Sequence, residues 1–278
     1  KIKKRVNKKG EPCQNCIEHQ SIRKEAQFPV IKVIIPEKSL EAIAKIVFKR
    51  SRRMFTRKYS DLDILRVIIA MCLTKCQYVR EFYDEVKRGN IYYPYKLPTR
   101  QTLTYRMKYI DKAKISGIMK KVAGSILAID SSELRNKKER LHALYNSKEK
   151  VVVDFEVSER REWDVGIEMT KGCKGSLIIG DRGYHVKKFR AEGEGEKIIR
   201  PRGKAGEEFM KSELMRAIYR KRWEIEYYFE RLKLGLVIEK INKATLFTKL
   251  TIRLIGQELT YLIGMLKKQP KLYQVLFT

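Results

Sequence analysis

Two aspartates directly follow short apolar runs that are typical of buried strands. Asp130 comes after residues 127–129, and Asp181 comes after residues 178–180. A carboxylate at the end of a central strand is held by a rigid backbone and faces the crevice in which ligands collect. Strands also end in Asp simply because the chain turns there. The two residues are therefore candidate metal ligands, and ordinary turns are the alternative.

A third acid, Glu226, lies in a segment whose apolar spacing predicts one long helix over residues 207–236. At 100° of rotation per residue, Tyr219, Arg222 and Lys233 fall with Glu226 within an arc of about 60°. This polar stripe borders an apolar stripe, where a side chain can line a cleft. The alternative is an Arg222–Glu226 pair on a solvated helix, which would contribute only ~0.2–0.5 kcal/mol. The apolar stripe consists of Leu214, Ile218, Ile225, Phe229, Leu232 and Leu236.

These residues together resemble a known family. The spacing Y-x2-R-x3-E-x6-K, formed by Tyr219, Arg222, Glu226 and Lys233, matches the signature around the catalytic glutamate of DDE transposases of the insertion-sequence-four type. The segment 181–184 resembles the surroundings of that family's second catalytic aspartate, and the segment 128–131 those of the first. The resemblance covers roughly residues 120–266. It implies that Asp130, Asp181 and Glu226 are catalytic metal ligands in an RNase H-like domain.

The resemblance also sets expectations for the chain between these acids. Trp163-Asp164 stands where such proteins often carry an aspartate before a helix. Family members often have a large β-rich insertion between the second aspartate and the glutamate. Only 45 positions separate Asp181 from Glu226, so we expect this insertion to be short or absent. That puts in doubt a hairpin intermediate that depends on it.

The implied chemistry is phosphoryl transfer assisted by two Mg²⁺ or Mn²⁺ ions. Such ions prefer oxygen ligands, and a pair of them can activate the attacking oxygen and stabilise the leaving one. The freed 3′-OH would then attack target DNA. On the helix of Glu226, Arg222 and Lys233 would hold phosphates, and Tyr219 would donate a hydrogen bond to one. Trp223 and Tyr227 would either stack on a base or pack in the core.

The overall charge points to a polyanionic partner. The chain has 62 Lys and Arg against 33 Asp and Glu, which gives a net charge of +29. A field of this size attracts nucleic acid. A helix opening at Thr99 would carry Arg100 and Arg106 on a surface suited to DNA, and an ordinary basic helix is the alternative. Arg182, beside Asp181, completes the predicted DNA contacts.

The elements that must position these residues fall into two parts. Helical apolar spacing predicts an all-helical, basic, DNA-binding domain over residues 1–115. Runs rich in β-branched residues then predict strands at 125–129, 140–145, 150–157, 176–180 and 196–200, with a hairpin turn at 146–149. With the helix that bears Glu226, they predict a mixed α/β catalytic domain over 116–278, which ends in an amphipathic helix. Should the register differ, Asp154 is the competitor of Asp130.

The five cysteines do not suggest a disulfide framework. Cys13-x-x-Cys16, with His19 nearby, is either half of a zinc site or part of a flexible basic tail, because no second Cys/His pair follows at suitable spacing. The sequence has neither a secretory signal nor an apolar run long enough for a membrane span. It begins with Lys1 rather than Met, which leaves the completeness of its N-terminus open.

The leading interpretation is a cut-and-paste DNA transposase acting on double-stranded transposon ends and target DNA. The resemblance implies a homodimer in the synaptic complex, and we expect a prokaryotic, cytoplasmic, nucleoid-associated protein. One alternative is an RNase H-like nuclease or resolvase that hydrolyses DNA without joining strands. Another is a non-catalytic DNA-binding protein derived from a transposase. The intact acids, together with Tyr219, Arg222 and Lys233, argue against the last.

Overall fold

A computed structural model of the chain describes residues 31–32, 35, 37–48, 58–76, 78–122, 126–134, 139–236 and 249–268. The predicted features around Cys13, Cys16 and His19 lie outside these residues. In the described part, no helix is both long and apolar enough to cross a membrane.

A five-stranded mixed sheet forms the centre of the C-terminal part. Its strands are β3 (Ile126–Glu133), β4 (Arg140–Asn146), β5 (Val151–Ser158), β6 (Leu177–Gly180) and β7 (Glu196–Ile199), in the order β5-β4-β3-β6-β7. The chain β3-β4-β5 is an antiparallel meander, whereas β6 and β7 lie parallel to β3. Each strand overlaps a predicted one, but β3 continues to Glu133, so Asp130 lies within the strand and not directly after it as predicted. The sheet confirms the predicted mixed α/β class and is consistent with an RNase H-like fold.

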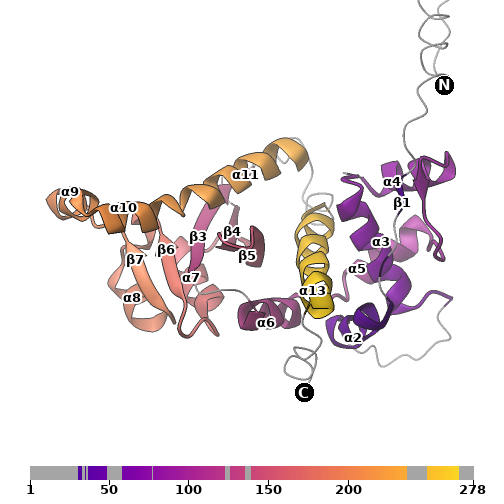
Figure 1. Ribbon diagram of the computed structural model, residues 1–278, viewed down its shortest axis with the longest axis horizontal. Coiled ribbons are helices and arrows are strands. Elements are labelled where there is room, and N and C mark those ends of the chain that lie inside the picture. The colour runs from indigo at the N-terminus through magenta and orange to yellow at the C-terminus, as the bar shows by residue number, and fades with distance from the viewer. Residues whose placement is uncertain are drawn as a thin grey trace, which may run out of the picture.

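Helices cover both faces of this sheet. Asp130 pairs with Ala143, which pairs with Phe155, so these side chains share one face. The helix α11 (Trp223–Leu236) packs on that face, where Tyr228 meets Tyr145 at 5.1 Å between ring centroids. The helix α7 (Glu162–Thr170) covers the opposite face, and α8 (Lys187–Glu192) packs beside α7. Figure 1 shows the sheet between these layers.

The N-terminal part is mostly helical but not entirely so. Its helices are α2 (Glu37–Val47), α3 (Asp61–Leu73), α4 (Val79–Lys87), α5 (Arg100–Met107) and α6 (Lys112–Val122). Two short strands, β1 (Ile31–Lys32) and β2 (Ile91–Tyr92), pair in parallel. The prediction of an all-helical part missed this pairing, because two-residue strands have no periodicity to detect. The helix α3 lies at the core of this part, and its residues Ile64, Leu65 and Ile68 are fully buried. A capping box formed by Ser60 and Asp63 stabilises its N-terminus.

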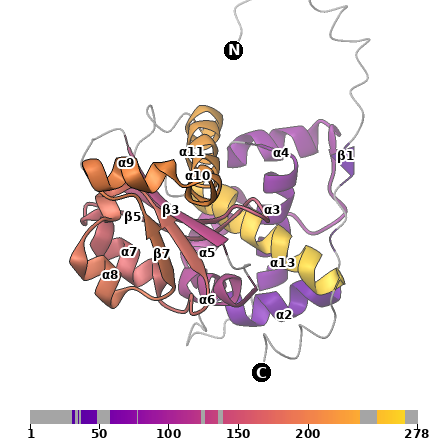
Figure 2. The same cartoon turned by 60° about the vertical axis from the view of Figure 1, so that its left-hand side comes forward.

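The C-terminal helix joins the two parts. It consists of α13 (Gly256–Lys268), preceded by a π-helical turn, η3 (Thr251–Ile255). Its apolar side contacts α2 and α3, and it also contacts β5 and α6. Both views of the ribbon show α13 standing between the N-terminal helices and the sheet (Figures 1 and 2). Burial of Leu259, Leu262 and Ile263 therefore links the sheet domain to the helical part.

Candidate active site

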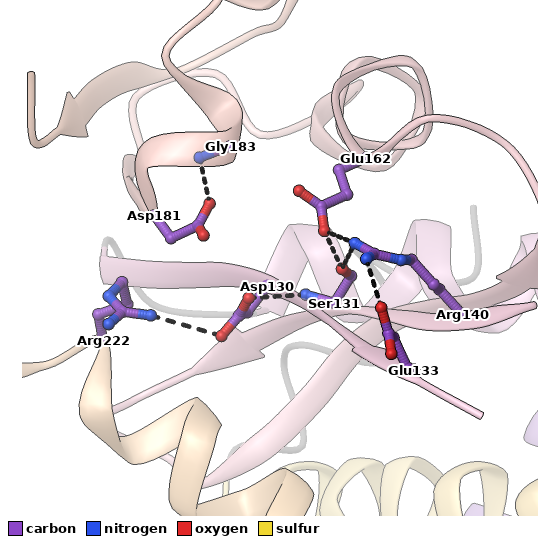
Figure 3. A network of polar contacts seen from close by, with 8 residues as sticks. All are labelled: Asp130, Ser131, Glu133, Arg140, Glu162, Asp181, Gly183 and Arg222. Atoms are coloured by element: carbon purple, nitrogen blue, oxygen red, sulfur yellow. Dashed lines mark hydrogen bonds and ion pairs between the residues drawn. The ribbon is translucent and has the colours of Figure 1, made fainter. Parts of the chain in front are cut away.

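The first two predicted acids lie side by side near the centre of the sheet, where the short strand β6 ends beside β3. The parallel register of β3 and β6 pairs Ile129 with Gly180, so the next residues are Asp130, which is still within β3, and Asp181, which directly follows β6. Both carboxylates are part-buried, and Figure 3 shows them directed toward the same space. The strand pairing alone produces this proximity, because the two residues are 51 positions apart in the sequence.

The carboxylate of Asp130 is held on both sides. It accepts a hydrogen bond from the Ser131 backbone N–H at 2.8 Å and forms an ion pair with Arg222 at 3.5 Å (Figure 3). Burial nevertheless raises the pKa of Asp130 to about 7, and the charges of Asp181 and Glu226 add to the rise. Ser131 and Arg222 oppose it. A nearby cation would favour the ionised form of this group.

Asp181 begins a tight turn that fixes its own side chain. Its Oδ1 accepts a hydrogen bond from the Gly183 N–H at 2.8 Å, at the start of the 3₁₀ helix η1 (Arg182–Tyr184). A Cβ on Gly183 would overlap the Glu162 carboxylate and lie 3.0 Å from Asp181 Oδ1. A side chain at position 183 would therefore have to displace the end of the Glu162 side chain, which contacts Ser131 and Arg140.

The segment that bears Glu226 is not one helix. It divides into α9 (Lys204–Lys211), α10 (Glu213–Arg220) and α11, which corrects the predicted helix over 207–236. The first break occurs where Ser212 adopts an extended conformation and caps α10. The second is a 3₁₀-type turn, in which the N–H of Arg222 bonds the carbonyl of Tyr219 at 3.0 Å. Tyr219 therefore lies on α10, Arg222 in the turn, and Glu226 and Lys233 on α11.

Arg222 bridges the sheet and α11. Its Nη1 lies 3.5 Å from Asp130 Oδ2 and 2.5 Å from Glu226 Oε1. Its guanidinium also stacks 5.3 Å from the ring centroid of the buried Tyr219. As a result Glu226 is joined to Asp130 through an arginine. Among the described residues no three His, Cys, Asp or Glu side chains are grouped closely enough to hold one ion.

A polar network that was not predicted lies beside Asp130. Glu162, at the start of α7, accepts a hydrogen bond from Ser131 Oγ at 2.6 Å and forms an ion pair with Arg140 (Figure 3). Arg140 also reaches Glu133 at 2.9 Å. Sequence reasoning singled out Asp164 instead, and its carboxylate pairs with Lys188 at 3.1 Å. An acid in the first turn of a helix after a strand was the only available signal for Glu162.

The competitor Asp154 belongs to another site. Asp154 precedes Phe155, whose side chain shares a face of the sheet with those of Asp130 and Ala143. Because side chains alternate between the two faces along a strand, the side chain of Asp154 projects from the opposite face. There it accepts a hydrogen bond from Ser116 Oγ at 2.7 Å and pairs with Lys120 at 2.9 Å. Its role is to attach α6 to the sheet.

The predicted DNA contacts differ in their exposure. Arg100 and Arg182 are exposed, and Lys233 is half-buried on α11. Arg106, in contrast, is buried: its guanidinium pairs with Asp61 and donates to the Tyr59 carbonyl at 3.2 Å. The prediction that Arg106 faces DNA does not match this inward orientation. Its partners lie more than 40 positions away in the sequence, so the periodicity of a single helix could not predict the contact.

Two aromatic residues on α11 are exposed to solvent, although core packing was one of the two predictions made for them. Trp223 and Tyr227, on α11, are 65% and 61% exposed. Large exposed aromatic side chains on the helix that carries Glu226 are available for contacts with a partner.

Comparison with known proteins supports the relationship to transposases. Neither the curated proteins nor the solved structures contain a match to this chain. A family model does match, and its region begins in α6 and includes Asp130, Asp181 and Glu226. This agrees with the predicted relationship at the level of the domain: residues 122–246 are similar to the family described as transposase DDE domain.

Proposed function

We propose that the chain is a DNA transposase of the insertion-sequence-four type, which cleaves transposon ends and joins the freed 3′-OH to target DNA. The observation that carries the proposal is the convergence of Asp130, within β3, and Asp181, directly after the adjacent parallel strand β6, with Glu226 linked to Asp130 through Arg222. The match of residues 122–246 to the transposase DDE domain supports it.

The donor chemistry of this site suits Mg²⁺ or Mn²⁺. All three side chains offer carboxylate oxygens, which hard divalent cations prefer. The pKa of Asp130 is raised partly by the charges of Asp181 and Glu226, a like-charge repulsion that a cation relieves. Asp130, Asp181 and Glu226 are the residues that would hold the ions. Bound there, two such ions would supply an activated oxygen nucleophile and stabilise the leaving oxygen.

The other residues would position the DNA and the acids. The Gly183 N–H would hold the Asp181 carboxylate in place, and Ser131, held by Glu162, would fix β3 beside Asp130. Arg222 would exchange its contact with Glu226 for a phosphate, because its planar fork binds phosphate and carboxylate alike. Exposed Arg182 and half-buried Lys233 would add positive charge that attracts the phosphates of the same DNA strand.

The N-terminal part would bind the transposon end. We assign DNA binding to residues 1–115 and catalysis to residues 116–278, a boundary that falls within α6. Arg100, Gln101 and Tyr105 project from the exposed side of α5, which Thr99 caps through the Thr102 N–H at 3.2 Å. Holding two ends together requires a homodimer at synapsis, and such a protein would work on the DNA of a prokaryotic cytoplasm.

The test uses the inverted repeats that flank the coding region as labelled DNA ends. With Mg²⁺ or Mn²⁺ the chain should cut at the repeat boundary, and pre-cut ends with a 3′-OH should be joined to a target plasmid. Cutting without joining would overturn the transposase assignment in favour of a nuclease. Absence of both reactions, with the ends still bound, would overturn the catalytic assignment.

A further inference from the structure

A cavity of about 710 Å³ lies on the side of α11 that faces the N-terminal part. It is formed by the C-terminal end of α3 and the turn after it, the β4–β5 turn, α11, and η3 with the start of α13. Around the axis of α11, the lining residues Glu224, Tyr228 and Arg231 lie on the flank away from Arg222 and Glu226, whereas Trp223 and Tyr227 lie between that flank and Glu226. Asp130, Asp181 and Glu226 do not line the cavity.

The lining combines aromatic rings with an excess of positive charge. Tyr145 and Tyr228 form an inner wall, and the Tyr228 hydroxyl is fixed by a 2.7 Å hydrogen bond to Gln257. Trp223 and Tyr227 stand exposed at the rim. Five cationic side chains line the cavity against one acid, Glu224; they are Lys75, Lys150, Arg231, Lys249 and Arg253. A flat aromatic group that carries negative charge matches this lining.

Unusual backbone conformations converge on the same cavity. Lys75 and Lys150 have φ values of 58° and 54°, and among the described residues they are the only non-glycine residues with positive φ. Lysine is disfavoured in this region relative to Gly or Asn, so such residues often mark functional positions. Both lysines are exposed and line the cavity. The π-helical turn η3 adds Ile252 and Arg253, and π-helical turns are also frequent at functional sites.

One buried oxygen in the lining, Glu224 Oε2, has no hydrogen-bond donor among the described residues. Glu224 Oε1 accepts from Lys221 at 3.2 Å, whereas Glu224 Oε2 is buried and has no hydrogen-bond partner in the described part of the chain. An N–H group of a nucleobase would satisfy this oxygen, since every base has such a group on its edge.

We propose that this cavity binds a nucleotide unit, with the base against the aromatic rings and the phosphate on the lysines and arginines. The site is distinct from the cleavage site, and the proposal does not depend on phosphodiester cleavage. The nucleotide can belong to an unpaired stretch of a DNA strand or can be a free mononucleotide. Both sources present the same chemistry, and the experiment distinguishes them.

The chain offers a built-in reporter for the test. It has two tryptophans, Trp163 on α7 and Trp223 at the cavity. Trp163→Phe leaves Trp223 as the sole tryptophan, whose fluorescence a stacked base quenches. The full-length W163F chain is titrated with single-stranded oligonucleotides, with the same sequences as duplexes, and with deoxynucleoside monophosphates. We expect saturable quenching by a single strand or by a mononucleotide, and weaker binding as salt rises.

Variants at the two lysines separate binding from folding. In the W163F background, Lys75→Asn and Lys150→Asn each remove one positive charge from the cavity. Because Asn tolerates a positive φ, the thermal stability of these variants should not fall. Tyr227→Ala should weaken binding by roughly fivefold or more through lost stacking. The matched control is the exposed Lys174→Asn, before β6 and away from the cavity. Quenching by oligonucleotides alone assigns the source to a DNA strand, and quenching by mononucleotides at similar concentration assigns it to free nucleotide.

Two results would overturn the proposal. One is an unchanged Trp223 signal with every nucleic-acid probe while fluorescence anisotropy shows that labelled duplex binds. The other is equal affinity of Lys75→Asn, Lys150→Asn, Tyr227→Ala and the Lys174→Asn control. Both results are independent of cleavage, so they would leave the proposed transposase function untouched.

Discussion

The guanidinium of Arg222 lies 2.5 Å from a carboxylate oxygen of Glu226. The same Nη1 atom lies 3.5 Å from Asp130, 92 residues earlier in the chain. A single part-buried arginine thus connects the central strand β3 with the helix that packs over it. This link relates the geometry of the candidate site to its electrostatics, because Arg222 opposes the rise in the pKa of Asp130.

Replacing Arg222 should therefore disturb both acids. In Arg222→Gln we expect DNA cleavage to fall by about tenfold or more, because the phosphate contact is lost and the pKa of Asp130 rises further. The cleavage rate of this variant should need a higher pH to reach its plateau than that of the wild type. Single-turnover cleavage across pH measures both effects. Arg220→Gln, exposed on the neighbouring α10, is the control, and equal profiles for the two variants would contradict the role of Arg222.

A methyl group at position 183 should also impair the candidate active site, because it would crowd Asp181. Gly183→Ala would push the Glu162 carboxylate and crowd Asp181 Oδ1, so we expect slower cleavage with DNA affinity retained. The control is Gly117→Ala on α6, where an added Cβ meets nothing within 4 Å. That change should raise stability by up to about 1 kcal/mol through helix propensity and leave cleavage alone. If Gly183→Ala cleaves DNA at the wild-type rate, the close approach has no catalytic meaning.

How much of this arrangement the sequence predicts depends on the range of the interactions. The strands β3 to β7 were predictable, because runs of β-branched residues are local signals. The division of 207–236 into three helices was not, because an extended Ser212 and a 3₁₀-type turn at Arg222 depend on tertiary packing. The pairing of Asp130 with Arg222 joins positions 92 residues apart, and no periodicity encodes it.

The two arginines predicted on α5 should behave differently from each other. Arg106 is buried against Asp61, so Arg106→Gln should lower the free energy of unfolding by roughly 3 kcal/mol. Arg100 is exposed, so Arg100→Gln should weaken binding of the transposon end and leave stability nearly unchanged. Chemical denaturation and fluorescence anisotropy give the two readouts. A stability loss as large in Arg100→Gln as in Arg106→Gln would refute the distinction.

Glu258, on α13, should make the protein less stable as the pH rises. It is fully buried, and within the described residues neither carboxylate oxygen has a hydrogen-bond partner. Burial raises the pKa of Glu258 well above its usual value of 4.5. The folded protein thus binds a proton that the unfolded chain releases above about pH 4.5, and stability falls as pH rises toward the folded pKa.

The variant Glu258→Gln isolates this effect. The slope of its unfolding free energy against pH should differ from the wild-type slope by up to ~1.4 kcal/mol per pH unit above pH 4.5. The variant should therefore be the more stable protein at neutral pH, with the advantage shrinking below that value. Glu41→Gln, at an exposed position of α2, is the control and should follow the wild type. Urea unfolding at several pH values tests this, and parallel curves for wild type and Glu258→Gln would contradict it.

The central claim is that Asp130, Asp181 and Glu226 act together in metal-dependent DNA cleavage. Its most direct test is end cleavage in Mg²⁺ or Mn²⁺ by Asp130→Asn, Asp181→Asn and Glu226→Gln, each checked for folding and for DNA binding. Asp164→Asn on α7 and Glu230→Gln on α11 are the matched controls, the second being an exposed acid one turn from Glu226. We predict that each of the three variants binds DNA ends but does not cut them, while both controls cut normally. Full cleavage by any one of the three would contradict the account.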